Sequence, residues 1–145
     1  MTQIEENIDE FVKRIKNDEH LSEYTFVKGY SGEKIPNPIT KVMIVVDTLD
    51  TQISTEFIGE SAGENLVGRM YDITLRFRVY AKSFDSGDSL SLCANALYDA
   101  IKRNDVSKVC SSIKLFPISY ESTMRTVYRD VSVNLCYCLY EEASV

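Results

Sequence analysis

The clearest catalytic spacing in this sequence is a glycine–serine–glycine motif near its middle. Gly59, Ser61 and Gly63 match the G-x-S-x-G pattern, in which a serine on a sharp strand-to-helix turn acts as a nucleophile. Here the residues that follow predict a strand rather than a helix. The single histidine, His20, also precedes the serine, whereas hydrolases with this motif place their histidine last. We therefore interpret the motif as part of a glycine-rich loop.

The cysteines offer a second chemistry, because four thiolates can hold a zinc ion. The four cysteines are Cys93, Cys110, Cys136 and Cys138. Structural zinc sites usually use C-x2–4-C knuckles, whereas Cys136 and Cys138 have the spacing of one face of a strand. We expect buried thiols without metal. The sequence contains no phosphate-binding or dinucleotide-binding motif, so we expect no cofactor and no enzymatic activity.

Length and charge limit the possible functions. The 145 residues predict a single domain over 1–145, with 44% hydrophobic and 26% charged residues and a net charge of −6. A protein that reads nucleic-acid sequence usually carries a basic excess instead. No signal-peptide pattern and no apolar run of membrane-spanning length is present. We expect a protein that is made in the cytoplasm and does not enter membranes.

The other elements are organised around a stretch with strand periodicity. Apolar and polar side chains alternate through residues 69–82, RMYDITLRFRVYAK, which predicts a long strand with one buried and one open face. Further strands are predicted at 24–28, 41–48, 109–116 and 126–140, helices at 3–17 and 86–103, and loops at 29–38 and 49–68. The second of these loops has room for a short extended piece at 52–58. The apolar run at 42–46 favours a central place in the sheet for its strand.

This order, α-β-β-β-α-β-β, predicts an α+β fold. Its sheet would have four to five strands, mixed or antiparallel, with long loops. Each helix carries one apolar stripe, so we expect both to pack on one face of the sheet. Thr2 and Glu5 predict a capping box for the first helix, and Asp85 or Ser86 a cap for the second.

Two charged patches are candidates for a binding surface. Residues 42–68 hold five acids and no lysine or arginine. The acids are Asp47, Asp50, Glu56, Glu60 and Glu64. A basic row with a tyrosine lies on the open face of the long strand, and consists of Arg76, Arg78, Tyr80 and Lys82. Each patch could simply be solvated, and Asp72 or Asp130 could pair within the row if the long strands are neighbours. Alternatively, the two patches are complementary parts of a subunit interface.

The sequence resembles the phage tail terminator, or tail completion, family. The resemblance is carried by the end of the long strand, VYAK at 79–82, and by the helix motif ANALYDAI at 94–101. The closing segments, from PISYE at 117–121 to YRDVSVNL at 128–135, are also similar. It covers most of the chain and is one of overall pattern.

The resemblance implies a structural protein without catalytic residues. Such proteins form a ring, usually a hexamer, on the last ring of the tail tube, stop tube growth and form the collar or head-joining surface. The implied partners are further copies of itself, the tube protein, the sheath protein in a contractile tail, and a head-completion or connector protein where a capsid exists. The implied location is a virion tail or a headless tail-like bacteriocin. The alternatives are another head–tail connector or neck protein, or a stand-alone ligand-binding α+β domain.

Overall fold

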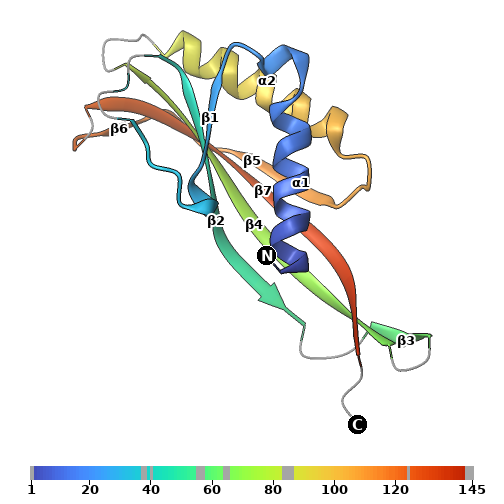
Figure 1. Ribbon diagram of the computed structural model, residues 1–145. Helices are drawn as coiled ribbons and strands as arrows, with labels where there is room; N and C mark the ends of the chain where they lie inside the picture. The colour runs from blue at the N-terminus through green and yellow to red at the C-terminus, as the bar shows by residue number, and fades with distance from the viewer. Residues whose placement is uncertain are drawn as a thin grey trace.

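The computed structural model describes residues 2–36, 39, 41–54, 58–63, 66–82, 87–123 and 125–142. These residues form two α-helices, two short 3-10 helices and a seven-stranded mixed sheet (Figure 1). The elements are α1 (Gln3–Lys16), η1 (Glu19–Leu21), β1 (Thr25–Lys28), η2 (Gly29–Ser31), β2 (Met43–Ile53), β3 (Ile58–Gly63), β4 (Leu66–Lys82), α2 (Asp88–Asn104), β5 (Cys110–Leu115), β6 (Ser119–Glu121) and β7 (Thr126–Glu142). The α+β class predicted from the sequence is confirmed.

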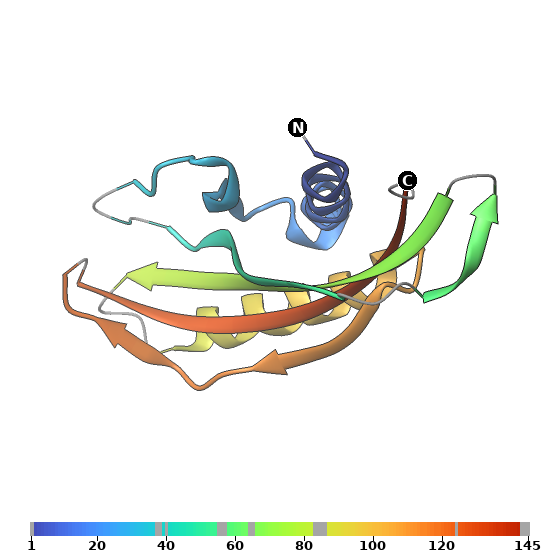
Figure 2. The same ribbon diagram turned by 90° about the horizontal axis from the view of Figure 1, so that it is seen from below.

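The sheet is built around the pair β4 and β7. These two strands are antiparallel over their whole lengths, from Leu66 opposite Glu142 to Lys82 opposite Thr126. The strand order is β1-β2-β4-β7-β5, with β3 added to β4 and β6 added to β7. Only β1 with β2 is a parallel pair among the described strands. Figure 2 shows β2 and β5 on opposite sides of the central pair.

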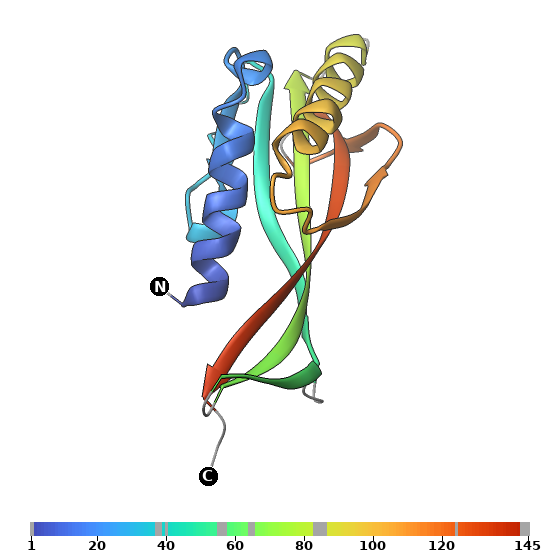
Figure 3. The same cartoon turned by 90° about the vertical axis from the view of Figure 1, so that its right-hand side faces the viewer.

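Both helices cover the same face of this sheet, as predicted (Figure 3). The helix stripes and alternate residues of β2, β4 and β7 form one buried cluster. Its members on these three strands are Ile44, Val46, Ile73, Leu75, Phe77, Val79, Ala81, Val131, Val133 and Leu135, and β1 adds Phe26. Period-two alternation in the strands and helical spacing in α1 and α2 direct these side chains to one layer. Burial of this apolar surface is the main stabilising contribution to the fold.

The opposite face of the sheet carries a second, smaller core. It consists of Val27, Ile39, Met43, Val45 and Tyr80, with Ile35 and Tyr128 partly buried against it. The apolar run at 42–46 is thereby explained, because β2 lies between β1 and β4 there and is buried on both faces. The central position predicted for this strand is correct over Met43 to Val46.

Two carboxylates tie α1 to the rest of the fold. Asp9 accepts hydrogen bonds from the Tyr30 hydroxyl at 2.8 Å and from Lys28 Nζ at 3.1 Å. These bonds, the one from Tyr30 first, lower the pKa of Asp9. Asp18, just beyond the helix, accepts from the Arg103 guanidinium at 3.0 Å and from the Asn104 amide at 2.8 Å. The start of the chain is thus fixed to η2 and to the end of α2.

The N-cap of α1 is the one predicted from the sequence, whereas the N-cap of α2 lies at a different residue. Thr2 and Glu5 form the predicted capping box on α1. The predicted caps of α2, Asp85 and Ser86, lie outside the described residues, and the N-cap position is Gly87 with φ 93°. A side-chain cap was expected one or two residues earlier, whereas the backbone enters α2 at Gly87 in a left-handed conformation that glycine adopts without strain.

The loop predicted at 49–68 is wrong over 49–53, 58–63 and 66–68, which are strand. Strand β2 continues to Ile53, β3 occupies Ile58–Gly63, and β4 begins at Leu66, three residues before the predicted start. Apolar and polar residues alternate along a strand when one of its two faces is buried. Every residue from 48 to 53 is exposed, so this part of β2 has no buried face and no alternation. Strand β6 was also missed, since it has only three residues.

Strand β3 and the paired ends of β4 (66–70) and β7 (138–142) form an arm. Figures 1 and 3 show the arm extending beyond the N-terminal end of α1, away from both helices. The arm is therefore held by strand pairing rather than by packing against a helix.

Candidate subunit interface

The polar face of the long strands is the surface on which the sequence placed a basic row. One member, Arg76 on β4, donates from Nη2 to Asp47 Oδ2 on β2 at 3.2 Å. The two residues lie opposite each other on neighbouring strands. One of the alternatives for the acidic and basic patches was contact between subunits, but at this point the two patches meet within one chain.

Arg78, the next member, is engaged more completely. Its Nε and Nη2 atoms donate to the two carboxylate oxygens of Asp130 at 2.7 and 2.9 Å, and its guanidinium carbon lies 4.1 Å from the centre of the Tyr128 ring. Side-chain exposure is 18% for Arg78 and 16% for Asp130. The alternative pairing of the row with Asp130 is thus confirmed, and Arg78 has little capacity left for a partner.

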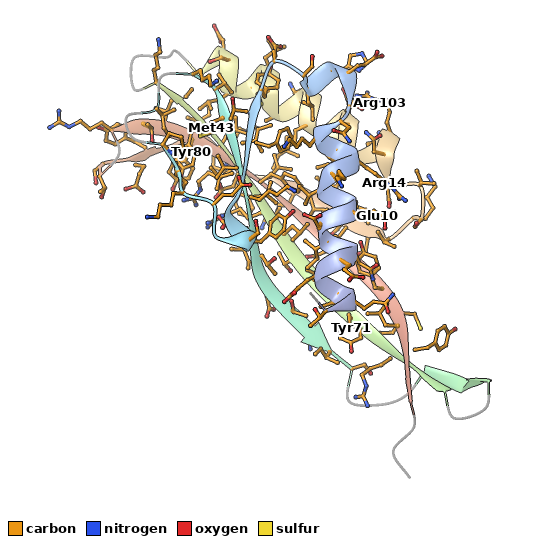
Figure 4. All side chains as sticks on the ribbon, viewed as in Figure 1. Glu10, Arg14, Met43, Tyr71, Tyr80 and Arg103 are labelled. Carbon is orange, nitrogen blue, oxygen red and sulfur yellow. The ribbon has the colours of Figure 1, made fainter. Side chains whose placement is uncertain are left out.

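The remaining members of the two patches have different surroundings. Tyr80 is buried in the second core, beside Met43 (Figure 4), so it is not available to another molecule. Lys82 and Asp50 are exposed. Glu60 is on β3, but its side chain is outside the described part of the structure, and Glu56 and Glu64 lie outside the described residues.

The second half of β2 is an open sheet edge. Strand β1 pairs only with Met43 to Val46, and η2 follows beside it, close enough for Gly29 to contact Asp47. From residue 48 to 53, none of the described strands lies on the side of β2 away from β4. Leu49 and Ile53 are 52% and 48% exposed. An exposed strand with unpaired backbone groups and apolar side chains is a common docking element.

The opposite edge of the sheet is β5. It pairs with β7 on one side, and no described strand lies on its other side. Beside this edge is an open groove of about 390 Å³. The groove is lined by Tyr98, Ile101 and Lys102 of α2, by Asp105 and Lys108 of the turn, and by 110–113 of β5.

The charge of this groove is positive at its accessible rim. The carboxylate of Asp105 is buried and accepts from the backbone N–H groups of Val109 and Cys110, each at 3.0 Å. Lys102 and Lys108 are exposed. The single acid that lines the groove is therefore engaged by the turn, whereas the lysine ammonium groups are accessible.

Sequence reasoning missed this second edge, although the sequence carries a signal for it. Residues 106–115 contain Lys108 and Lys114 and no acid, which is the inverse of the acidic composition of 42–68. The long strand 69–82 contains a more prominent group of basic residues, which obscures this signal.

The motifs that could carry chemistry occupy ordinary structural positions. Gly59, Ser61 and Gly63 lie within strand β3, which pairs with β4, rather than on a turn that leads into a helix. The cysteines are free thiols on both faces of the sheet. Cys93 is in the main core, where burial raises its pKa to about 12. Cys136 lies opposite Asp72 on the polar face.

The sheet therefore separates Cys93 from Cys136 and Cys138, and the four cysteines do not converge on one point. No cluster of three or more potential metal ligands is found among the residues with a described placement. Of the four thiols, Cys93 is buried, Cys110 and Cys136 are partly exposed, and Cys138 is exposed, so the expectation of buried thiols is correct for Cys93 alone.

Comparisons with known proteins leave the family open. No protein-family model matches the sequence, and no curated protein matches it. Within the described part of the chain, neither α-helix has the length and apolar character that crossing a membrane requires.

Proposed function

We propose that this protein is a tail terminator: a structural subunit that assembles into a ring on the end of a tail tube and stops its growth. The proposal rests on the sequence resemblance together with the shape of the subunit. A ring needs two different complementary surfaces on each copy, and a cap needs a further surface for the tube.

The observation that carries the proposal is the arm together with the open edge of β2. A domain that works alone usually covers its strand ends and sheet edges. Here exposed apolar side chains accompany both features: Leu49 and Ile53 on β2, and Tyr140, which is 58% exposed, on β7 of the arm. Such surfaces become stable when a neighbouring subunit or the tube covers them.

The location and partners follow from this proposal. The protein would be found at the end of a tail or tail-like particle, in contact with the tube protein, with the sheath in a contractile system, and with a head-joining protein where a capsid is present. The ring is proposed to be a hexamer. No catalytic role is assigned to any residue.

The test is electron microscopy of the protein co-expressed with the tube protein from the same gene neighbourhood. The expected result is tubes that carry a distinct cap at one end, with this protein located in the cap by an affinity label. Rings that bind a head-joining protein and ignore the tube would instead identify a connector. Small particles that bind neither would overturn the proposal and favour a ligand-binding domain.

A further inference from the structure

The two open edges of the sheet have opposite charge. On β2, the exposed residues 48–53 contain Asp50 and no cation; on the β5 side, residues 106–115 contain Lys108 and Lys114 and no acid. Neither Asp50 nor Lys114 has an ion-pair partner within the described residues. The chain therefore presents an acidic edge and a basic edge at the two ends of one sheet.

We propose that a second copy of this chain docks its β2 edge against β5, so that Asp50 of the neighbouring copy lies opposite Lys114 and the sheet continues across the subunit boundary. The occupant is a second copy because the acidic edge that complements β5 is found on this same chain. The inference rests on the proposed ring and specifies the interface that closes it.

Strand direction agrees with this pairing. Strand β2 is antiparallel to β4, β4 to β7, and β7 to β5, so β5 runs opposite to β2 within one chain. In a ring whose axis is parallel to the strands, neighbouring copies are related by a rotation about that axis. This rotation does not change the direction of any strand. Strand β5 and the neighbour's β2 are then antiparallel, and the sheet keeps its pattern.

The two faces of the sheet also agree. Lys114 lies opposite Ser132, and Asp50 opposite Thr74, so both side chains are on the polar face. With Lys114 beside Asp50 in an antiparallel register, Ile113 lies beside Thr51 on the helix-covered face. Both strands are regular there, because their bulges fall between Thr48 and Asp50 in β2 and between Cys110 and Ser112 in β5.

The groove next to β5 supplies an apolar contact for the same register. Ile53 of the neighbouring copy then lies near the bulge of β5 at Ser111, a residue that lines the groove together with Tyr98 and Ile101 of α2. Ile53 is 48% exposed in the single chain. Its transfer from water into this groove would add apolar burial to the backbone hydrogen bonds that strand addition provides.

Site-directed cross-linking tests this pairing directly. One tagged protein carries Lys114→Cys and a differently tagged one carries Asp50→Cys, both with Cys138→Ser to remove the exposed native thiol. They are mixed at about 1 mM, a concentration that populates even weak complexes, both alone and with the tube protein. The expected product is a covalent dimer that contains both tags, and neither protein should form a covalent dimer when incubated by itself.

The control replaces Lys114→Cys by Lys82→Cys, since Lys82 is also an exposed lysine and lies at the end of β4. A cross-link with Lys82→Cys that equals or exceeds the one with Lys114→Cys would overturn the proposal. The absence of any mixed dimer at 1 mM, with and without the tube protein, would also overturn it.

Charge reversal provides a second measurement. Lys114→Glu should weaken self-association by roughly fivefold or more per interface, because a cross-strand ion pair becomes a repulsion, and mixing with Asp50→Lys should restore it. Caps that form on tubes without the Lys114–Asp50 cross-link would refute the edge pairing and leave the terminator proposal intact. Cross-linked oligomers that never bind a tube would support the edge pairing and overturn the terminator proposal.

Discussion

Arg78 on β4 and Asp130 on β7 form a two-point ion pair, in which both carboxylate oxygens accept from one guanidinium group at 2.7 and 2.9 Å. The pair lies next to the second core, against the ring of Tyr128. It joins the two longest strands of the sheet at a position where water has limited access, as the low exposure of both side chains indicates.

Removal of this pair should destabilise the fold more than removal of its neighbour. Asp130→Ala leaves a half-buried guanidinium without a carboxylate, and we expect the free energy of unfolding to fall by about 2–3 kcal/mol. Asp47→Ala is the matched control, because the Asp47–Arg76 pair has one 3.2 Å hydrogen bond and exposures of 32% and 27%. That variant should lose about 0–1 kcal/mol. Urea unfolding followed by circular dichroism measures both, and equal losses would contradict the prediction.

Asp18 should give the fold a pH-dependent contribution. Its hydrogen bond from Arg103, the largest of several causes, holds the pKa of Asp18 well below its usual range, and its side chain is only 7% exposed. Because the folded-state pKa is depressed, this stabilisation is complete above the unfolded pKa of about 4 and is lost as the pH falls below it. Asp18→Ala should therefore lower the unfolding free energy by about 1–2 kcal/mol at pH 7.

The difference between wild type and Asp18→Ala should shrink progressively between about pH 4 and pH 2. Glu10→Ala serves as the control, since Glu10 forms an exposed pair with Arg14 on the surface of α1 (Figure 4). It should change stability by less than about 0.5 kcal/mol. A difference that stays constant down to pH 2 would exclude the ionised carboxylate as the cause.

Gly29 should tolerate a side chain poorly, for a steric reason. A Cβ atom at this position would lie 2.2 Å from Asp47 Oδ1 and 3.0 Å from the Val46 carbonyl oxygen. Gly29→Ala must displace Asp47 from Arg76 or shift η2 away from β2, and we expect a loss of about 1–3 kcal/mol. Gly32→Ala is the control for backbone strain alone. Gly32 has φ 85°, and a Cβ atom added there would have no other atom within 4 Å, so no clash contributes. The strain in that variant should cost about 1 kcal/mol, and a larger loss than for Gly29→Ala would refute the steric argument.

The acids at positions 56, 60 and 64 should matter for assembly rather than for folding. Replacement of all three by glutamine keeps side-chain size and removes negative charge, so the unfolding transition should stay within about 0.5 kcal/mol of wild type. If this segment contacts the tube or a neighbouring copy, capping weakens and tubes grow beyond their normal length. Tube lengths measured by electron microscopy check this, and an unchanged distribution would remove these residues from the interface.

The sequence predicted those parts of the fold in which one face is buried. The long strand at 69–82, the stripes of both helices and their packing on one face were correct, because apolar burial leaves a periodic signal. The ion pair between Arg78 and Asp130 was foreseen as an alternative, since cross-strand partners follow once the strands are known to be neighbours.

The parts that were missed have a common physical origin. Residues 48–53 form a strand through pairing with β4 alone, so their side chains carry no buried pattern. Tyr80 has the spacing of the polar face but is buried, because residues far away in the chain, such as Val27 and Ile39, cover that end of the strand. Local sequence alone identifies neither the strand with which a segment pairs nor the distant segment that covers its side chains.

The pairing of β4 with β7 also determines when the chain can fold. The partners are distant in sequence, as Leu66 with Glu142 and Lys82 with Thr126 illustrate, and the main core needs Val131, Val133 and Leu135 from β7. Until β7 has left the ribosome, β4 lacks its main partner strand and much of the core that would cover its apolar residues. Folding dominated by such distant contacts is slow, and the unfinished chain exposes apolar surface that favours aggregation. We therefore expect the yield of folded protein to depend on chaperones, most strongly at high expression.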